Sequence, residues 1–199
     1  KRNPNTWIID FGNILSEREC QQYATAFGYV REHVLPLRVN HREPVQKNYW
    51  WRLARPCPDM FVALQGLDRF LVTTIVSKYR LFVWQQAPIN PDHTVAVFAR
   101  SDDYFFGVLH SRFHEVWALA QGTQLREKES GFRYTPTTCF ETFPFPEAHA
   151  EHEAAIGAAA KALNALRENW LNPPEWTRTE TLEFPGTVGG PWDRYIDPA

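Results

Sequence analysis

One segment, residues 102–146, constrains the architecture of this 199-residue chain more than any other. Its first part, residues 104–120, spaces apolar side chains as an amphipathic helix does, and Gly122 then ends the helix. A polar and charged loop follows over residues 122–138, and an aromatic segment rich in proline, residues 140–146, closes the segment. Because this pattern describes a stiff platform that presents a polar loop, it favours recognition over catalysis.

Three β-rich runs precede that segment and predict a small sheet. They read RFLVTT (residues 69–74), LFVW (81–84) and TVAVFA (94–99), and they hold the β-branched and aromatic residues that favour strands. Residues 75–80 (IVSKYR) connect the first two runs, and the proline-rich residues 86–93 form a turn before the third. We therefore expect an α+β fold with a small antiparallel or mixed sheet flanked by helices.

Local signals also place helices near the N-terminus. Ser16 and Glu19 form a capping-box pattern, which predicts a helix over residues 16–27. A second helix is expected over residues 29–35, and the polar, basic residues 38–48 are expected to form a loop.

Further helices are predicted beside the sheet and after it. Residues 59–67 predict a short helix. Ser101 is the expected N-cap of the helix in the central segment, and we expect that helix to break near Gly107. The alanine-rich residues 146–170 predict a long C-terminal helix, and the proline-rich residues 172–199 predict an extended tail.

The cysteines and the first residues indicate the cellular compartment of the chain and its relation to a longer polypeptide. Cys20, Cys57 and Cys139 form no C-x-x-C pair, which argues against a disulfide framework or a zinc site and fits a reducing cytosol. The chain begins KRNPNTWIID, with no initial Met, no signal-peptide core and no apolar run that could span a bilayer. We therefore expect a cytoplasmic piece of a longer polypeptide, without membrane contact.

Charge is unevenly distributed along the sequence. Residues 140–199 hold ten acidic and four basic side chains, a net charge of −6, so residues 1–139 hold thirteen acidic and seventeen basic ones, a net charge of +4. A basic N-terminal part with an acidic C-terminal part is compatible with a polyanion bound on one side and a protein on the other. Ordinary surface scatter explains the same numbers.

The run NYWWRL leaves the role of one arginine open. Trp50 and Trp51 cannot face the same way on a regular element, and we expect both to anchor a core. Arg52 either joins that packing or reaches a phosphate.

One tetrapeptide imitates a catalytic motif. Asn172-Pro173-Pro174-Glu175 begins like the N-P-P-aromatic motif that holds a flipped adenine, in which the aromatic ring stacks on the base. Glu175 cannot stack, and the tetrapeptide follows a predicted helix. We therefore interpret it as a helix stop.

Histidine pairs and an aspartate pair also have structural explanations. His149 and His152 are three residues apart, and His110 and His114 are four apart, but no third metal ligand accompanies either pair. We expect solvated, packing or capping roles for the histidines. Helix capping likewise explains two carboxylates that could suit acid–base chemistry, Asp102 and Asp103. The sequence thus predicts no catalytic residue, no metal site and no cofactor bound by this chain.

Binding groups are more prominent than catalytic ones. Cations that can neutralise phosphates or donate to guanine are interleaved with aromatic residues, and acidic residues that can accept from cytosine share the central loop. A solvated charged hairpin explains the same residues without a ligand. The basic members are Lys78, Arg80, Arg100, Arg126, Lys128 and Arg133, and the aromatic members are Tyr79, Phe132 and Tyr134.

Four motifs together resemble the target-recognition region of large adenine-specific DNA methyltransferases. They are FFGVLHSRFHEVWALAQG, RYTPTTCFETFPFP, the opening WIIDFG and the later NYWWRLARP. The resemblance covers residues 7 to about 170. It is to the MmeI-like (type IIL) enzymes, which combine restriction and modification in one chain, and to related phage-defence methylases.

The resemblance implies a division of labour within a longer polypeptide. Residues 1–146 would form a DNA target-recognition domain, and residues 147–199 would begin a C-terminal helical segment with a tail. The catalytic domain that binds S-adenosylmethionine would precede residue 1 and would be a partner of this chain. The chain itself would bind double-stranded DNA and select the sequence that the N6-adenine methyltransferase modifies.

The resemblance also implies particular DNA contacts. Similar proteins read bases from a short loop ahead of Arg133-Tyr134-Thr135, although the loop here is longer than the family pattern. The base-reading candidates are therefore Arg126, Glu127, Lys128, Glu129 and Arg133, any of which can face the groove. The candidates for DNA-backbone contact are Arg52, Lys78, Arg80 and Tyr134. The alternative function is a protein–protein interaction domain of a defence complex without direct DNA contact.

Overall fold

The structure of the protein is a computed structural model, and it divides into two compact units. One unit, here called the sheet unit, comprises residues 60–177, and the other comprises residues 1–59 with 178–199. The structure describes residues 8–12, 15–55, 57–87, 89–124 and 131–177, together with the backbone of residues 181–183 and 196–198.

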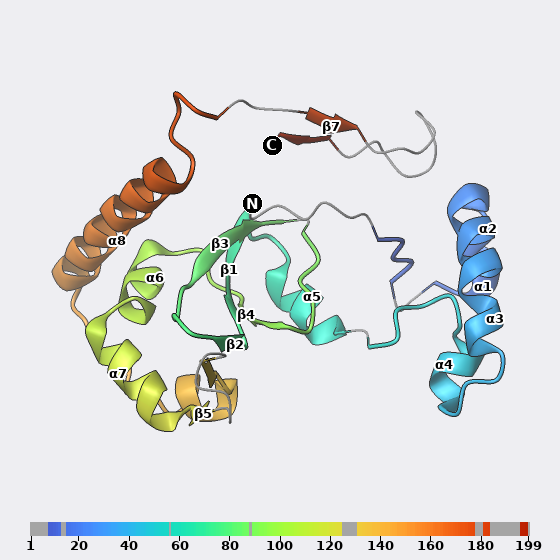
Figure 1. Cartoon of the computed structure of the whole chain (residues 1–199), viewed down its shortest axis with the longest axis horizontal. Coiled ribbons are helices and arrows are strands. Elements are labelled where there is room, and N and C mark those ends of the chain that lie inside the picture. The colour runs from blue at the N-terminus through green and yellow to red at the C-terminus, as the bar shows by residue number, and fades with distance from the viewer. Residues whose placement is uncertain are drawn as a thin grey trace. The chain divides into compact units, whose positions relative to one another are not determined.

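A three-stranded antiparallel sheet forms the centre of the sheet unit (Figure 1). The strand order is β3-β1-β4, with β1 at Arg69–Thr74, β3 at Val83–Gln86 and β4 at Val95–Phe98. Leu71 of β1 pairs with Trp84 on one side and with Phe98 on the other. Residues 70–73 of this central strand are all buried. The predicted α+β fold with a small antiparallel sheet is confirmed.

Aromatic side chains dominate the core of the sheet unit. The ring of Phe82 meets those of Phe98, His114 and Tyr134 edge to face, with centroids 5.4–6.0 Å apart. Such edge-to-face pairs add specific geometry to apolar burial. The buried residues of this cluster are Leu71, Phe82, Ala96, Phe98, Phe105, Phe106, Leu109, Ala118, Phe132, Tyr134, Cys139 and Ala160.

The helix expected over residues 104–120 is two helices, α6 (Asp103–Leu109) and α7 (Arg112–Gln121). The predicted break near Gly107 is wrong. The chain turns instead at His110, because the side chain of Ser111 accepts a hydrogen bond from the His114 amide and begins a new helix. The first cap is Asp102 rather than Ser101, since the Asp102 carboxylate accepts from the Phe105 amide at 2.8 Å.

Gly107 has a packing role that explains its position within α6. A Cβ at Gly107 would lie 2.8 Å from Cγ2 of Ile156 and 3.1 Å from Cβ of Ala160. Both residues belong to α8 (Ala150–Leu171), the long helix predicted from the alanine-rich sequence. Glycine therefore lets α6 and α8 approach closely.

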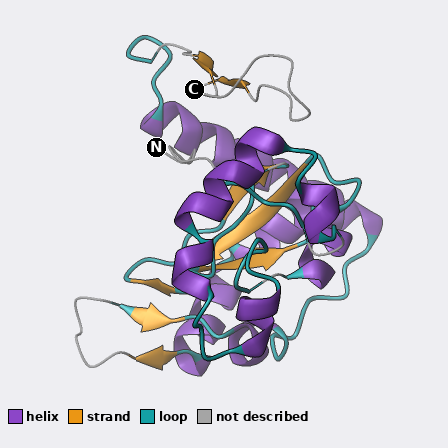
Figure 2. Ribbon diagram, turned by 90° about the vertical axis from the view of Figure 1, so that its right-hand side faces the viewer, coloured by secondary structure: helices purple, strands orange, loops and turns teal. Residues whose placement is uncertain are grey.

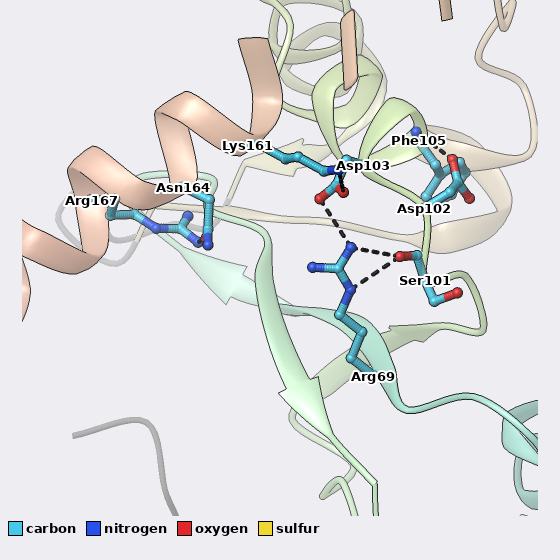
Figure 3. Close-up of polar contacts among 8 residues, drawn as sticks. All are labelled: Arg69, Ser101, Asp102, Asp103, Phe105, Lys161, Asn164 and Arg167. Atoms are coloured by element: carbon cyan, nitrogen blue, oxygen red, sulfur yellow. Dashed lines mark hydrogen bonds and ion pairs between the residues drawn. The ribbon is translucent and has the colours of Figure 1, made fainter. Parts of the chain in front are cut away.

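A polar cluster ties β1 to α6 and α8 (Figure 3). Arg69 of β1 donates to the Ser101 carbonyl and pairs with the Asp103 carboxylate at 3.0 Å, while Lys161 of α8 lies 3.6 Å from the other Asp103 oxygen. The Arg69 guanidinium also lies 3.9 Å from the ring centroid of Trp84. Asp103, in the first turn of α6, thus connects that helix to β1 and to α8.

A second, smaller sheet lies beside the first and includes part of the expected loop over residues 122–138. Its order is β2-β6-β5, with β2 at Val76–Ser77, β6 at Phe132–Arg133 and β5 at Thr123–Gln124. A five-residue π-helix, Pro136–Phe140, follows. The prediction of a continuous loop is therefore wrong for these residues, since β6 pairs with β2 and β5 on its two sides.

The second unit contains four short helices: α1 (Glu17–Cys20), α2 (Ala24–His33), α3 (Leu35–Arg38) and α4 (Pro44–Asn48). The capping box is present, but the single helix expected over residues 16–27 breaks after Cys20, where hydrogen bonds three residues apart tighten the turn. The expected loop over residues 38–48 contains α4. Two strands, β7 (Thr181–Glu183) and β8 (Ile196–Pro198), pair within the predicted tail.

The tryptophans of this unit form a core, as predicted. Trp50 and Trp51 are both buried, with ring centroids 5.9 Å apart. They join a cluster with Phe11, Cys20, Ala26, Phe27 and Val30.

Candidate nucleic-acid interface

The loop predicted to read bases connects β5 to β6, neighbouring antiparallel strands of the small sheet (Figure 2). Four candidates, Arg126, Glu127, Lys128 and Glu129, lie outside the described residues. The described root of this hairpin is defined by Gln124, whose side-chain amide donates to the Gly131 carbonyl at 3.2 Å. Arg133 pairs with Thr123 across the hairpin and is exposed.

Gly131 fixes the root of the hairpin against a neighbouring turn. Its φ angle is +85°, and a Cβ there would lie 2.3 Å from the Ser77 carbonyl oxygen and 2.4 Å from the Lys78 amide nitrogen. Only glycine combines that backbone angle with so close an approach. Gly131, the described residue at the end of the loop predicted to read bases, therefore lies directly beside the turn that follows β2.

That turn carries two exposed side chains of the predicted DNA-binding type. Lys78 and Tyr79 are both exposed, and the lysine Nζ lies 5.6 Å from the tyrosine ring centroid. Ser77 donates its hydroxyl to the Tyr79 carbonyl at 2.6 Å, which closes the turn. Since Ser77 also pairs with Phe132 of β6, the structure brings Lys78 and Arg133 to the same small sheet.

Arg80 holds this turn to the rest of the sheet unit, and its predicted contact with the DNA backbone stays a prediction. Its guanidinium donates to the Thr73 hydroxyl and to the carbonyls of Thr74, Ile75 and Phe132. It also lies 4.7 and 4.9 Å from the ring centroids of Phe132 and Tyr134. Burial lowers the pKa of Arg80 to about 10, so the side chain stays charged at neutral pH.

Tyr134, the other candidate beside this turn, has no exposed surface with which to touch DNA. It is completely buried, and its hydroxyl lies 3.1 Å from Nε2 of His114. Nδ1 of His114 lies 3.0 Å from the Leu109 carbonyl and must donate to it, so Nε2 accepts from the tyrosine. Burial lowers the pKa of His114 to about 4 and raises that of Tyr134, so both groups are neutral.

The remaining histidine of the central segment also has a structural role. Nε2 of His110 lies 2.9 Å from the Phe82 carbonyl, and burial lowers the pKa of the ring. The same carbonyl accepts a hydrogen bond from Arg167 of α8 at 2.9 Å. Packing and capping roles for His110 and His114 are therefore confirmed. Within the described part of the chain, no three His, Cys, Asp or Glu side chains gather as a metal site would require.

Arg52 belongs to the second unit and makes contacts there. Its guanidinium donates to the Leu15 carbonyl at 3.1 Å and lies 4.4 Å from the ring centroid of Tyr49. Its main-chain carbonyl accepts from Arg38. These contacts support the packing alternative for Arg52, and a phosphate contact stays a prediction.

Sequence reasoning missed Gly131 and Gln124 as structural determinants of the hairpin. A glycine directly before the F-R-Y residues was a usable signal for a positive φ angle. The pairing of Gln124 with Phe132 depends on strands two residues long, which leave no periodic pattern.

The described site combines a rigid small sheet, an exposed cation and aromatic side chain, and a buried supporting network. Residues 61–147 match the family model of the MmeI target recognition domain, which confirms the resemblance for this segment. A target recognition domain of this kind implies a role in DNA recognition.

One curated relative was also found. The chain is 34% identical over 65 residues to DNA methyltransferase A of Bacillus subtilis (strain 168), a match that covers 33% of this chain and 7% of that protein. No solved structure matches the chain significantly. Among the described residues, no helix has the length and apolar character needed to cross a membrane.

Proposed function

We propose that this chain selects the DNA sequence modified by an N6-adenine methyltransferase of a restriction–modification or phage-defence system. The observation that carries the proposal is the match of residues 61–147 to a target recognition domain, supported by the exposed Lys78 and Arg133 of the small-sheet region. The DNA on which a restriction–modification or phage-defence system acts lies in the cytoplasm, so we propose that the chain acts in that compartment too.

The described geometry sorts the candidate contacts into two roles. Lys78 and Arg133 are exposed on the small sheet and are suited to direct contact with phosphates or base edges. The partly buried Arg80 and the buried Tyr134 hold the strands in place. Arg126, Glu127, Lys128 and Glu129 remain the proposed base readers, because donors and acceptors on one loop can distinguish base pairs in the major groove.

Methyl transfer itself would belong to another domain of the same polypeptide, with S-adenosylmethionine as its cofactor. The DNA methyltransferase that this chain resembles is a far longer protein than the segment matched. We therefore expect the 199-residue chain alone to transfer no methyl group to DNA. Incorporation of labelled methyl groups by the purified chain would contradict this division of labour.

A salt-dependent titration tests the proposed function. Fluorescence anisotropy with a labelled duplex should give a Kd of roughly 10⁻⁴ to 10⁻⁶ M for binding without the preferred sequence. Log K should fall linearly with log salt, because each neutralised phosphate releases counterions. Lys78→Gln and Arg133→Gln should each weaken binding and reduce that slope, whereas Lys161→Gln on α8 serves as a charge-matched control. A DNA affinity and salt dependence that neither substitution changes would contradict the proposed surface.

A specific observation favours the alternative, a protein-interaction domain. A largely apolar groove of about 1090 Å³ lies between α7 and α8, and Phe113, Val116 and Leu163 are among its lining residues. Phe113 is 83% exposed, which is unusual for a phenylalanine. If a protein partner were the only ligand, Phe113→Ser would abolish partner binding, and DNA would not bind at any salt concentration.

A further inference from the structure

Tyr79 is an exposed aromatic side chain on the turn that Gly131 lies against. The ring is 70% exposed, in contrast to Tyr134, which is completely buried in the same unit. Burial of a tyrosine ring stabilises a fold, so a tyrosine left in solvent on a short turn contributes little to folding. The exposed ring is accessible to a ligand.

The turn that carries Tyr79 is held rigidly on three sides. Ser77 closes it with a hydrogen bond to the Tyr79 carbonyl at 2.6 Å. Arg80, the next residue, is fixed by hydrogen bonds to two neighbouring segments and by two aromatic rings. Gly131 lies against the Ser77–Lys78 peptide so closely that no side chain would fit between them. A rigid aromatic side chain loses little conformational entropy when it binds.

The chemistry of the turn matches an unstacked nucleobase beside a phosphate. An aromatic ring offers a π-face to any base, and stacking of this kind tolerates every sequence. The Lys78 ammonium lies 5.6 Å from the ring centroid, and lysine side chains are common partners of DNA phosphates. A turn that offers both groups can hold one nucleotide by its base and its backbone.

We propose that Tyr79 stacks on a DNA base that has lost its normal stacking neighbour, with Lys78 on the adjacent phosphate. This inference rests on the proposed DNA-recognition function and adds a contact to it. Enzymes that modify a base must take it out of the duplex, which leaves neighbouring bases unstacked. Tyr79 would act as a positioning residue that stabilises such a distorted duplex, while the β5–β6 loop reads the sequence.

The proposal predicts a preference for DNA that is already distorted. A duplex with a mismatch has less stacking to lose, so the 199-residue chain should bind it more tightly than a fully paired duplex. Stacking depends on the ring and not on the hydroxyl. Tyr79→Phe should therefore keep this preference, whereas Tyr79→Ala should lose it.

The experiment compares these variants by anisotropy and by the fluorescence of 2-aminopurine placed beside a mismatch. Tyr79→Ala should weaken binding to the mismatched duplex about tenfold or more and remove the change in 2-aminopurine emission, while Tyr79→Phe stays within about twofold of the unchanged chain. Tyr29→Ala, which removes a tyrosine that is 58% exposed in the second unit, is the matched control and should change neither signal. Circular dichroism checks that each variant is folded.

Each outcome decides one of the two proposals. Suppose that the unchanged chain binds DNA and that Tyr79→Ala binds both the mismatched and the paired duplex with the same affinities as the unchanged chain. The stacking proposal is then overturned, and DNA recognition stands. If Tyr79→Phe is as weak as Tyr79→Ala, the hydroxyl rather than the ring carries the contact, and stacking is again overturned. If the unchanged chain binds no duplex at low salt, both proposals fail.

Discussion

The hydroxyl of Tyr134 lies 3.1 Å from Nε2 of His114, and neither side chain reaches solvent. The histidine comes from α7 and the tyrosine directly follows β6, so one hydrogen bond joins the helical layer to the small sheet. Since Arg80 lies against the Tyr134 ring, the same contact supports the turn with Lys78 and Tyr79.

Removal of the Tyr134 hydroxyl should therefore destabilise the chain. Tyr134→Phe leaves Nε2 of His114 buried without a donor, which costs about 1–3 kcal/mol. Urea unfolding measures the change in the free energy of unfolding. Tyr79→Phe removes a hydroxyl from an exposed ring and should change it by less than about 0.5 kcal/mol. Equal effects of the two substitutions would contradict a structural role for the Tyr134 hydroxyl.

His114 should make stability depend on pH. Its pKa is about 4 in the fold and near 6.5 when unfolded, so the unfolded chain binds more protons between these values. This contribution to the free energy of unfolding is complete above pH 6.5 and is lost as the pH falls toward 4, by roughly 3 kcal/mol in all. Unfolding curves of the unchanged chain and of His114→Gln should converge as the pH falls. Parallel curves would exclude His114 as a source of the pH dependence.

Gly107 should resist substitution although it lies within a helix. Alanine favours helices over glycine by about 1 kcal/mol, but a Cβ at this position would lie 2.8 Å from Ile156 and 3.2 Å from the carbonyl oxygen of the same residue. We expect Gly107→Ala to destabilise the chain by about 1–3 kcal/mol, because α6 and α8 must separate.

Gly157 of α8 provides the matched control for Gly107. A Cβ at Gly157 would have its nearest neighbour at 3.6 Å, an ordinary contact, so Gly157→Ala should be neutral or stabilising. Thermal unfolding of both variants measures the difference. A stabilising Gly107→Ala would mean that the two helices do not pack as closely as described.

Gly131 should matter for DNA binding as well as for folding. Gly131→Ala would place Cβ 2.3 Å from the Ser77 carbonyl, which forces the hairpin away from the Lys78 turn. Gly66 also has a positive φ angle, +78°, but has no atom within 4 Å of a Cβ, so Gly66→Ala reports backbone strain alone. We expect DNA affinity to fall for Gly131→Ala and to stay unchanged for Gly66→Ala, as measured by anisotropy. Equal affinities would show that the hairpin and the turn act independently.

The main sheet was predictable because its strands are long enough to show the β-branched and aromatic composition that is typical of strands. Arg69–Thr74 holds six residues, most of them β-branched or aromatic, and its two neighbours carry similar runs. The small sheet was not predictable, because β2, β5 and β6 have two residues each and form through pairing between distant segments. The break in the central helix was misplaced for a related reason. Glycine at 107 suggested a weak helix, whereas contact with α8 gave it a packing role.

The individual structural roles of the candidate residues were less predictable than the strands, and their DNA contacts stay predictions. Lys78 and Arg133 are exposed on the small sheet, as a DNA-contacting role requires. Arg80 was chosen for its charge, yet its neighbours in space, Thr73 and Phe132, supply acceptors and an aromatic surface that hold its guanidinium within the fold. Sequence spacing does not reveal such contacts, because Phe132 is 52 residues away from Arg80.

The most direct test of DNA recognition by this surface is a backbone-amide NMR titration of the 199-residue chain with a short duplex. Binding at the small sheet predicts the largest shift changes at Ser77, Lys78, Tyr79, Gly131 and Arg133, and little change along α8 at Lys161 and its neighbours. The changes should diminish with added salt as affinity falls. Shift changes concentrated on α7 and α8, or none at duplex concentrations above 1 mM, well over the Kd of roughly 10⁻⁴ M, would contradict the account.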